Sequence, residues 1–323
     1  MKILCGKKLK NKQNCLVGLN NWWLLLKGKI IVNPFGIPGQ SLKQAKRLKE
    51  EFLLKGVQAE IMSDAFLRLN ISENQIKNQL GDTDFVVFLD KDKYLSEMIM
   101  RLGIRMFNSH ESIRVCDDKG QTYLALANKG FNLPKTQFAP VCYSSECQIS
   151  DEYINHLETF IGYPIIVKPS FGSCGNGIYK AQNREELVFA MQKLKLSPHL
   201  FQEYLGAEVG KDKRIIVIGG KAVAGMERFN SNDFRSNIAQ GGKGKKLDLT
   251  LKEYKNVVDT AESVAKELEL DYCGVDIIKG NNGEDVICEV NSNAFFEGIE
   301  AVTKINVASI YADYVIKEIL KKV

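Results

Sequence analysis

Short apolar runs alternate with amphipathic segments over the first third of the chain. Apolar runs at 30–32, 57–61, 85–89 and 105–107 are typical of strands, and residues 41–55, 72–80 and 93–102 carry apolar positions at helical spacing. The run FVVFL at 85–89 is apolar throughout, which is typical of a strand buried in a parallel sheet between helices. The pattern therefore predicts a small α/β domain over residues 28–112.

The remaining two thirds carry a less regular series of elements. Residues 274–291 contain two β-runs on either side of the turn cluster Asn281-Asn282-Gly283-Glu284, which predicts a β-hairpin. The chain contains no internal repeat and no low-complexity tract. Helices are predicted at 118–130, 151–161, 184–195, 251–268 and 306–322, and strands at 163–167, 200–205, 214–218 and 221–228.

Composition and charge limit the classes of function. The 323 residues are 45% hydrophobic and 26% charged, which is ordinary for a globular protein of two or three domains. The net charge of +5 is spread along the chain, which argues against a nucleic-acid surface and fits anionic ligands such as nucleotides. The apolar run at 22–26 is too short to cross a membrane, and we expect residues 1–27 to form an N-terminal extension.

The eight cysteines and three histidines also bear on the chemistry. The chain has no CxxC pair, which argues against a zinc site. Cys273 and Cys288 lie in apolar runs, which is typical of reduced, buried thiols in a cytoplasmic protein.

The hairpin carries a candidate metal site. A four-residue loop places Asp276 directly opposite Glu289, while Glu289 and Asn291, two apart on a strand, point to the same face. Facing carboxylates destabilise a strand pair unless a cation lies between them, and two carboxylates with an amide oxygen suit Mg²⁺. The alternative is a solvated hairpin with acidic residues by chance.

A glycine-rich loop follows the apolar strand that ends in Lys168. The loop at 170–177 combines three glycines with small polar side chains, and its backbone N–H groups can turn toward phosphate oxygens. It matches neither the P-loop, since Lys168 precedes the glycines, nor GxGxxG. A phosphate would offset the cost of burying the Lys168 ammonium. The alternatives are a plain turn and a lysine that reaches water at the strand end.

Further candidates lie in the strands that follow. The strand end at 201–205 has exposed backbone of the kind that hydrogen-bonds an adenine edge. Arg214 and Arg235 present guanidinium forks suited to phosphate or carboxylate oxygens, so they are candidates to hold a transferring phosphoryl group and its acceptor. Either arginine could equally be a surface residue without such a role.

The order of these motifs carries a resemblance to a known family. A helix with Asp118-Lys119, a strand ending in Lys168 with its glycine-rich loop, QEYL, DKR, DFRSN with a Gly-Gly pair, VD and EVNSN follow one another along the chain. In this order they resemble the ATP-grasp superfamily and, within it, the RimK family of amino-acid ligases, over residues 29–320.

The resemblance implies a fold class and a division of the chain. The fold is α+β, an ATP-grasp fold with an N-terminal pre-ATP-grasp α/β domain. The divisions are the extension at 1–27, the pre-ATP-grasp domain at 28–112, a central subdomain with the glycine-rich loop at 113–200 and a C-terminal subdomain with the metal site at 201–323.

The resemblance also implies roles for residues at the matching positions. The acceptor pocket is expected to involve the N-terminal domain and loops near 229–233 and 295–300. The ATP-binding positions are Lys119, Lys168, Ser170, Gly172, Ser173, Gly175, Gly177, Glu203, Tyr204, Leu205, Asp212, Arg235, Ser236 and Asn237. The catalytic positions are Arg214, Arg235 and Asn237, and the positions that hold Mg²⁺, or Mn²⁺ in its place, are Asp276, Glu289 and Asn291.

The reaction implied is ATP-dependent carboxylate–amine ligation. The γ-phosphoryl group of ATP passes to a carboxylate of a peptide, protein or small molecule, and the amine of glutamate or a similar amino acid attacks the acylphosphate to form an amide. The resemblance further implies a homo-oligomer, and no membrane or nucleic-acid partner is expected. One alternative is a nucleotide-binding regulatory protein with this fold and no turnover. A Rossmann oxidoreductase is disfavoured because Asn33-Pro34-Phe35-Gly36 stands where the glycine fingerprint would be.

Overall fold

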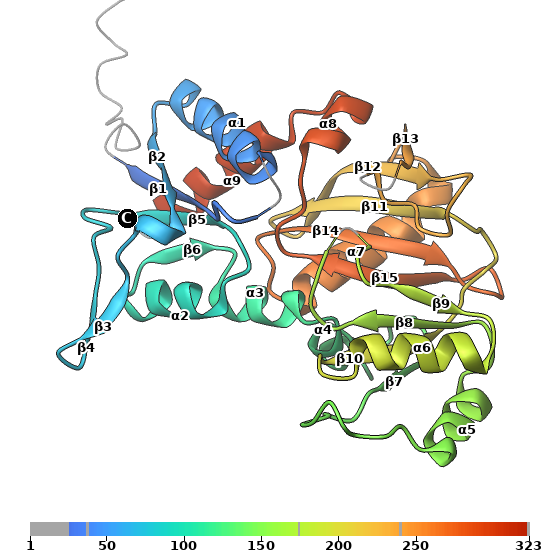
Figure 1. Cartoon of the computed structure of the whole chain (residues 1–323). Helices are drawn as coiled ribbons and strands as arrows, with labels where there is room; N and C mark the ends of the chain where they lie inside the picture. Colours follow the sequence, from blue (N-terminus) through green and yellow to red (C-terminus); the bar gives the residue numbers. More distant parts are fainter. Residues whose placement is uncertain (1–25, 37–38, 174, 239–240, 322–323) are drawn as a thin grey trace, which may run out of the picture.

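A computed structural model describes residues 26–36, 39–173, 175–238 and 241–321 of the chain. Three main sheets follow one another along this part of the sequence (Figure 1). The N-terminal extension expected at 1–27 lies outside the described residues except for Leu26 and Lys27. Within the described ranges, no helix has the length and apolar character needed to cross a membrane.

The first sheet is parallel, as the sequence predicts. Its strands β1 (Lys27–Val32), β2 (Gln58–Ser63), β5 (Phe85–Leu89) and β6 (Arg105–Phe107) have the order β2-β1-β5-β6. α1 (Gln40–Leu54) covers one face and α2 (Lys93–Arg101) covers the other (Figure 1). Successive residues of β1 serve the two faces, because Ile30 packs with Leu48 of α1 and Ile31 packs with Leu95 of α2.

The helix predicted at 72–80 is wrong. This segment belongs to a two-stranded hairpin of β3 (Asn70–Ser72) and β4 (Gln75–Lys77). Glu73 and Asn74 have positive φ angles of 52° and 59°, the backbone of a two-residue turn that reverses a hairpin. The polar segment offers little apolar surface to bury a helix face, so local turn chemistry decides its structure.

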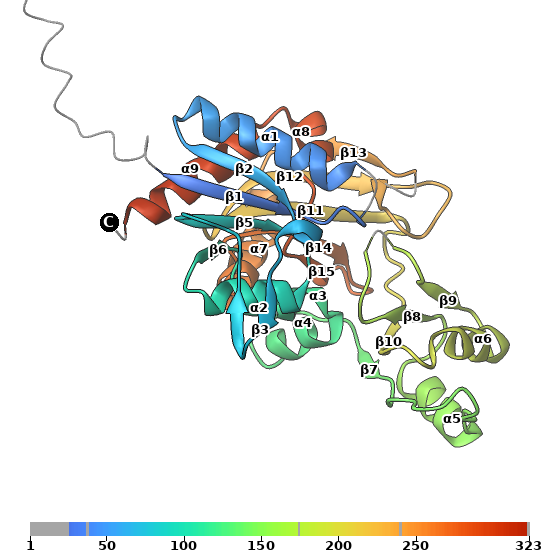
Figure 2. The ribbon, with the colours of Figure 1, turned by 60° about the vertical axis from the view of Figure 1, so that its left-hand side comes forward.

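The second sheet forms a unit with its own hydrophobic core. β7 (Thr136–Phe138), β8 (Ile165–Pro169), β9 (Tyr179–Ala181) and β10 (His199–Glu203) are antiparallel in the order β7-β10-β8-β9. α5 (Asp151–Phe160) and α6 (Arg184–Leu194) pack on the sheet, and their apolar side chains share a cluster with Val167 and Phe201. Figure 2 shows this unit projecting from the rest of the molecule. The glycine-rich loop connects β8 to β9.

The third sheet carries the hairpin that the sequence predicts. β11 (Lys211–Ile218), β12 (Lys221–Phe229), β13 (Lys243–Lys246), β14 (Tyr272–Lys279) and β15 (Asp285–Asn291) are antiparallel in the order β13-β12-β11-β14-β15. α7 (Lys255–Glu267) and α4 (Lys119–Leu126) cover one face. α9 (Val307–Leu320) packs with α1 on the other face. α3 (His110–Asp117), α8 (Glu297–Thr303), β7, β9 and β13 have no counterpart among the predicted elements.

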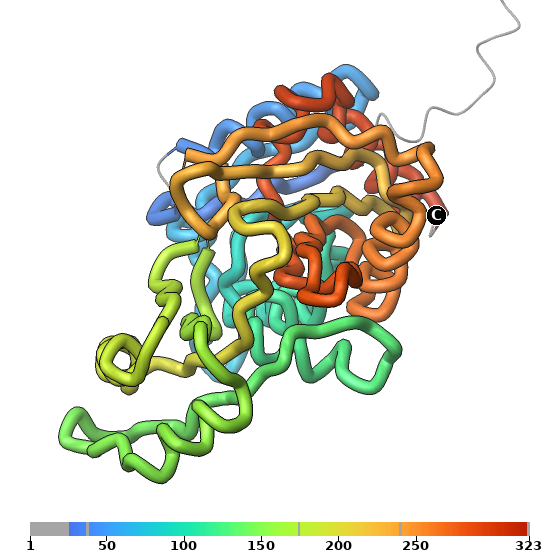
Figure 3. The backbone as a smooth tube through the Cα atoms, turned by 90° about the vertical axis from the view of Figure 1, so that its right-hand side faces the viewer, coloured from blue at the N-terminus to red at the C-terminus, as the bar shows by residue number. Residues whose placement is uncertain are grey.

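The first and third sheets share one hydrophobic core. Ile30 and Phe85 of the first sheet lie in the same cluster as Ile216 and Tyr272 of the third, with Tyr311 of α9. Figure 3 shows the third sheet, yellow to orange, in front of the blue first sheet. Burial of apolar surface therefore joins these two sheets, whereas the second sheet has a separate core.

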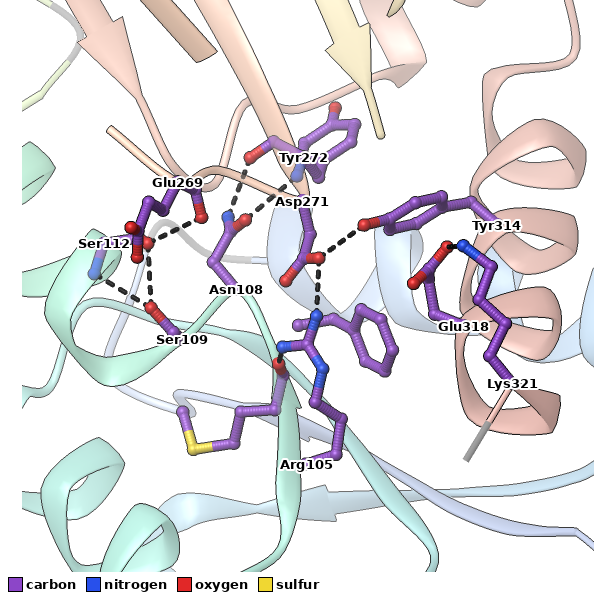
Figure 4. A network of polar contacts seen from close by, with 12 residues as sticks. Arg105, Asn108, Ser109, Ser112, Glu269, Asp271, Tyr272, Tyr314, Glu318 and Lys321 are labelled. Carbon is purple, nitrogen blue, oxygen red and sulfur yellow. Dashed lines mark hydrogen bonds and ion pairs between the residues drawn. The ribbon is translucent and has the colours of Figure 1, made fainter. Parts of the chain in front are cut away.

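A network of polar contacts also connects the first sheet to the third (Figure 4). The side chain of Asn108, just after β6, donates to the backbone oxygens of Tyr272 at 2.7 Å and Ser292 at 2.8 Å. Its oxygen accepts from the backbone nitrogen of Tyr272 at 2.9 Å. Beside it, Asp271 accepts from Arg105 and from the hydroxyl of Tyr314, each at 2.6 Å. Since Tyr272 begins β14 and Ser292 follows β15, Asn108 holds the open end of the hairpin.

Candidate active site

The second and third sheets contribute to one pocket, here called the first pocket, that contains most of the predicted ATP-binding residues. Its volume is about 150 Å³. The fold brings these residues together from positions that span 119 to 289 of the sequence. The predicted residues that line it are Lys119, Lys168, Gly172, Ser173, Gly175, Glu203, Tyr204, Leu205, Asp212, Arg235, Ser236, Asn237, Asp276 and Glu289.

Two buried lysines lie in the wall of the first pocket. The Nζ of Lys168, near the end of β8, donates to the hydroxyl of Tyr123 at 3.1 Å. The Nζ of Lys119, at the start of α4, donates to the backbone oxygen of Gly172 at 2.9 Å and lies 3.3 Å from Oε1 of Glu289. Burial lowers the pKa of Lys119, and the charge of Glu289 opposes this effect. An ammonium carries more N–H donors than these contacts use, so both lysines can also serve an anion.

The glycine-rich loop lies against this wall. Gly172, Gly175 and Gly177 have φ angles of 127°, 75° and 71°, a backbone conformation that side chains disfavour and glycine accepts. Lys119 holds the loop at Gly172, and the Nη1 of Arg235 donates to the backbone oxygen of Gly175 at 2.9 Å. Lys119 and Arg235 therefore hold the glycine-rich loop at Gly172 and Gly175, respectively.

The hairpin places the two predicted metal-binding carboxylates opposite each other. Asp276 pairs with Glu289 in the register of β14 and β15, and both line the first pocket, which confirms the predicted pairing. The length of the hairpin loop differs from the prediction. The loop covers 280–284, one residue more than predicted, and a register shift between Asp276 and Ile277 restores the pairing.

Two arginines neutralise Asp276. Its carboxylate accepts from Nε and Nη2 of Arg214 at 2.7 and 2.6 Å and lies 2.8 Å from Nη2 of Arg228. Arg228 is only 2% exposed and also donates to both carboxylate oxygens of Asp212. Burial alone would raise the pKa of Asp276, but the two guanidinium groups outweigh burial and hold it below its usual value. Arg214, Asp276, Arg228 and Asp212 therefore form a row of alternating charges inside the site.

Sequence reasoning missed Arg228. A regular hairpin around Gly219-Gly220 would place Glu227 opposite Asp212, but a register shift between Ile216 and Val217 places Arg228 there instead. The signal in the sequence is an arginine next to Glu227 on an otherwise largely apolar strand. Many surface arginines share that signal, so the residue could not be singled out.

The donor set on the hairpin fits a hard divalent cation. Burial would raise the pKa of Glu289, but nearby lysines, Lys119 above all, outweigh burial and lower it. The Nδ2 of Asn291 is buried and has no hydrogen-bond partner among the described residues, which leaves a donor free for an anion, whereas a metal ion would bind the amide oxygen. The described ranges contain no group of three or more His, Cys, Asp or Glu side chains placed to hold a metal. The candidate set therefore remains two carboxylates and an amide oxygen, ligands that suit Mg²⁺.

Another part of the first pocket is aromatic. Tyr204 directly follows β10, and its ring lies 6.4 Å from that of Phe234, with the Nζ of Lys180 3.6 Å from its centroid. The hydroxyl of Tyr204 is buried and lacks a hydrogen-bond partner among the described residues. Aromatic walls beside free polar groups suit a planar heterocycle such as adenine.

Some predicted residues lie beside the first pocket instead of in its wall. Ser170 supports Lys119, because its backbone oxygen accepts from the backbone nitrogen of Lys119 at 2.9 Å. Arg214 reaches Asp276 from the neighbouring strand and lines a different pocket. The predicted residues outside the lining are Ser170, Gly177, Arg214 and Asn291.

A second pocket, of about 900 Å³, adjoins the first. Arg228 and Asn237 line both, so the two pockets meet at these residues. Residues of α1, Arg214 and the segment at 295–301 form much of its wall. Of the two loops expected near the acceptor, the one at 295–300 lines this pocket and the one at 229–233 does not.

The second pocket is charged and contains an unused acceptor. The Oε1 of Gln44 is buried and has no hydrogen-bond partner within the described residues. Two long ion pairs connect α1 to α8, Lys43 with Glu297 and Arg47 with Glu300, each at 3.7 Å. Cations beside acids and a free amide oxygen suit a ligand with both carboxylate and amine groups. The resemblance implies that the N-terminal domain contributes to the acceptor pocket, and α1 is the part of that domain that lines the second pocket.

Comparisons with known proteins place these features in a family. The family model described as the RimK-like ATP-grasp domain matches residues 116–315. A probable alpha-L-glutamate ligase from Maridesulfovibrio salexigens is 36% identical over 220 residues, which are 67% of this chain and 68% of the relative. N-acetylaspartylglutamate synthase A from Homo sapiens is 31% identical over 227 residues, which are 70% of this chain and 56% of the human protein.

Solved structures share the fold. D-alanine–D-alanine ligase from Bacillus anthracis in complex with ATP has a TM-score of 0.69 and 16% identity, covering 92% of this chain and 98% of that chain. The ATP-grasp ligase PsnB, solved with a phosphomimetic variant of its minimal precursor, Mg and ADP, has a TM-score of 0.64 and 16% identity, covering 91% and 98%. The α+β fold and the ATP-grasp architecture predicted from the sequence are therefore confirmed.

The family match covers more than half of the chain, and the glutamate-ligase relative aligns over two thirds of it. The motifs that carry the resemblance lie in or beside one pocket of the structure. The chain therefore belongs to the RimK-like ATP-grasp family, and it is an ATP-dependent carboxylate–amine ligase.

Proposed function

We propose that this chain joins glutamate, or a similar amino acid, to a carboxylate of a peptide, protein or small molecule. The observation that supports this most directly is the junction of the two pockets at Arg228 and Asn237. A nucleotide in the first pocket and a carboxylate in the second would meet there, which is the proximity that phosphoryl transfer needs. The relatives named as a glutamate ligase and an N-acetylaspartylglutamate synthase support glutamate as the amine.

We assign ATP to the first pocket. The ammonium groups of Lys119 and Lys168 would bind phosphate oxygens, and the loop at 170–177 would cover them. The backbone at Glu203 and Leu205, next to the Tyr204 ring, would hold the adenine. The carboxylate of Asp212 already accepts from Arg228 and from Ser236, so a ribose hydroxyl would join an existing network.

Asp276, Glu289 and Asn291 would hold Mg²⁺, with Mn²⁺ as the alternative ion. When bound, such an ion neutralises negative charge on the phosphate oxygens. Arg214 and Arg228 add fixed positive charge beside Asp276, where charge develops on the transferring phosphoryl group.

The chemistry needs no nucleophile from the protein. An oxygen of the substrate carboxylate attacks the γ-phosphorus, ADP leaves, and an acylphosphate forms. The amine then attacks the activated carbonyl carbon, loses a proton and expels phosphate. Arg235 fastens the glycine-rich loop at Gly175, which would keep out the water that otherwise hydrolyses the acylphosphate.

The test is a substrate panel with two readouts. The full chain is incubated with ATP, Mg²⁺ and single amino acids, together with peptide and small carboxylate pools, and ADP release and ligated masses are measured. We expect ADP release and a mass gain that both require glutamate and an acceptor. Tight ATP binding with neither product across the panel would favour the alternative, a nucleotide-binding regulator without turnover. The same panel with Glu289→Gln controls for contaminating ATPases.

We also propose that the chain forms a homo-oligomer, as the family resemblance implies. Light scattering coupled to size exclusion at micromolar concentration measures its mass. A monomer across the concentration range would contradict this proposal without affecting the ligase assignment.

A further inference from the structure

The loop that joins β7 to α5 carries two cysteines that lie outside both pockets. Cys147 is exposed and Cys142 is half-buried, and neither lines the first or the second pocket. Their neighbours Val141 and Tyr143 are 68% and 92% exposed. Small molecules in solution can therefore reach this loop.

The loop folds so that the two cysteines are held on one turn. The backbone nitrogen of Cys147 donates to the oxygen of Ser144 at 3.2 Å, which closes a turn, and the Sγ of Cys142 donates to the same oxygen at 3.1 Å. Both bonds end on one oxygen, so the sulfur of Cys142 lies beside the backbone of Cys147. Thiols held this close need little backbone movement to form a disulfide.

The surroundings favour the thiolate form of Cys147. The Cys142 side chain has the largest effect that lowers the pKa of Cys147, and the ammonium of Lys195 adds a smaller one. Lys195 is held there because its Nζ donates to the backbone oxygens of Ser145 and Cys147. This combination of exposure and nearby positive charge is typical of reactive cysteines.

At other cysteines that the structure describes, burial disfavours the thiolate form. Burial raises the pKa of Cys116 to about 12 and that of Cys288 to about 11, and Cys273 is fully buried with a raised pKa as well. The expectation of buried thiols is therefore met at Cys273 but not at Cys288, which is half-buried in the wall of the first pocket. The loop at 142–147 departs from it further.

We propose that Cys142 and Cys147 form a reversible dithiol site that reacts with low-molecular-weight disulfides. The Cys147 thiolate attacks one sulfur of the small disulfide, so that a mixed disulfide forms and one small thiolate leaves. Cys142 then loses its proton and attacks the Cys147 sulfur, so that the intramolecular disulfide forms and the second small thiolate leaves. Two protein thiols are oxidised and one small disulfide is reduced, which balances atoms and electrons.

The test uses the full chain and glutathione disulfide. After incubation, free thiols are blocked, and the protein is digested with trypsin and then with an endopeptidase that cleaves after glutamate. Cleavage after Glu146 separates the two cysteines unless a disulfide joins them. We expect the two fragments to remain joined and to separate after treatment with dithiothreitol, while Cys116 and Cys273 react only in the unfolded protein. Separate fragments, whether or not they carry glutathione, would overturn the proposal.

Single variants test the order of attack. Cys142→Ala should leave Cys147 as a stable mixed disulfide with glutathione, and its Cys147 should form the thiolate at higher pH than the wild type. Cys147→Ser should react at Cys142 about ten-fold more slowly. Lys195→Gln should slow alkylation of Cys147 about two-fold, whereas Lys193→Gln, in the last turn of α6, should not. Faster reaction at Cys142 than at Cys147 would refute the assigned roles.

Discussion

The two pockets hold their charges in opposite ways. In the first, Asp276 and Arg228 are each 2% exposed and are joined by short ion pairs to Asp212 and Arg214. In the second, the ion pairs between α1 and α8 are long, and the side chains of Lys43 and Glu297 are 67% exposed. Buried, mutually paired charges fix a geometry, whereas exposed pairs exchange readily for other partners. We infer that the first pocket fixes the phosphoryl chemistry and the second leaves substrate choice to adaptable side chains.

The largest expected effect is on Arg228, where the two pockets meet. Arg228→Met leaves the buried carboxylates of Asp212 and Asp276 without their shared cation. Breaking a buried ion pair in this way costs about 3–5 kcal/mol, so we expect that loss in the free energy of unfolding together with loss of ADP formation. Urea denaturation measures the loss.

A surface arginine provides the control for Arg228. Arg101 pairs with Glu97 on the exposed side of α2. Arg101→Met should change the free energy of unfolding by less than about 1 kcal/mol. Similar urea midpoints for the two variants would show that the charges of the first pocket are no more tightly coupled than those of the surface.

Glu289→Gln should separate chemistry from stability. The amide keeps the shape of the side chain but removes the charge that Lys119 and the proposed metal ion require. We expect ADP formation to fall about 10²–10³-fold, the usual size of a lost charge-stabilising group. The melting temperature should fall less than in Arg228→Met, because the lost contact with Lys119 is offset by relief of the repulsion between Glu289 and Asp276. The measurement is ADP release as a function of Mg²⁺ concentration. Glu284→Gln, in the loop of the same hairpin, is the matched control, and equal activity in the two variants would remove the metal assignment.

Gln44→Leu tests the second pocket. The change removes a buried oxygen that has no partner among the described residues, and two long hydrogen bonds of 3.4 Å from Nε2 to Asn293 and Ala294. The backbone oxygen of Ala294 keeps its bond from Tyr272, so we expect the folded protein to lose about 1 kcal/mol. If this oxygen binds a substrate amine, the KM of that substrate rises about ten-fold while the KM of ATP stays the same. Steady-state kinetics with each substrate varied in turn gives both values. Lys49→Met, an exposed change on the same helix, is the control. Unchanged KM values for every substrate would exclude Gln44 from recognition.

The same contrast explains what the sequence could predict. Lys168, the glycine-rich loop and the facing pair of Asp276 and Glu289 belong to local patterns, a strand end, a loop and a hairpin, and the structure gathers them in one pocket. Arg228 escaped prediction because a one-residue register shift moves every later pairing on its strand, and a bulge leaves little trace in composition.

For the second pocket, the resemblance implies the N-terminal domain and the loop at 295–300, but it does not identify Gln44. Helical spacing places Gln44 on the buried stripe of α1 with Leu48, but it does not say what covers that stripe. The partners lie near Phe296, some 250 positions further along the chain, and only the tertiary fold brings them together. A polar residue on an apolar stripe was the available signal.

The smallest expected effect concerns a carboxyl in neither pocket. Asp64 follows β2 and lies near Asp90 and Asp92. Its neighbours therefore carry the same charge, whereas the carboxylates of the first pocket lie beside cations. Burial and then Asp90 raise the pKa of Asp64 to about 6. The folded protein therefore keeps a proton that the unfolded chain releases near 3.8, and stability falls as pH rises between these values.

Asp64→Asn should remove this pH-dependent loss. Because the carboxyl is partly exposed, the gain should be small, about 1–2 °C in melting temperature above neutral pH, and should vanish below about pH 4, where Asp64 is protonated in both states. Thermal melts across this pH range measure it. Asp82→Asn should have the opposite sign near neutral pH, because Asp82 pairs with Lys27 and has a lowered pKa. If the melting temperature of Asp64→Asn rose equally at acidic and neutral pH, repulsion among these carboxyls would not be the cause. The contrast between paired charges in the pockets and unpaired charges at Asp64 would then not hold.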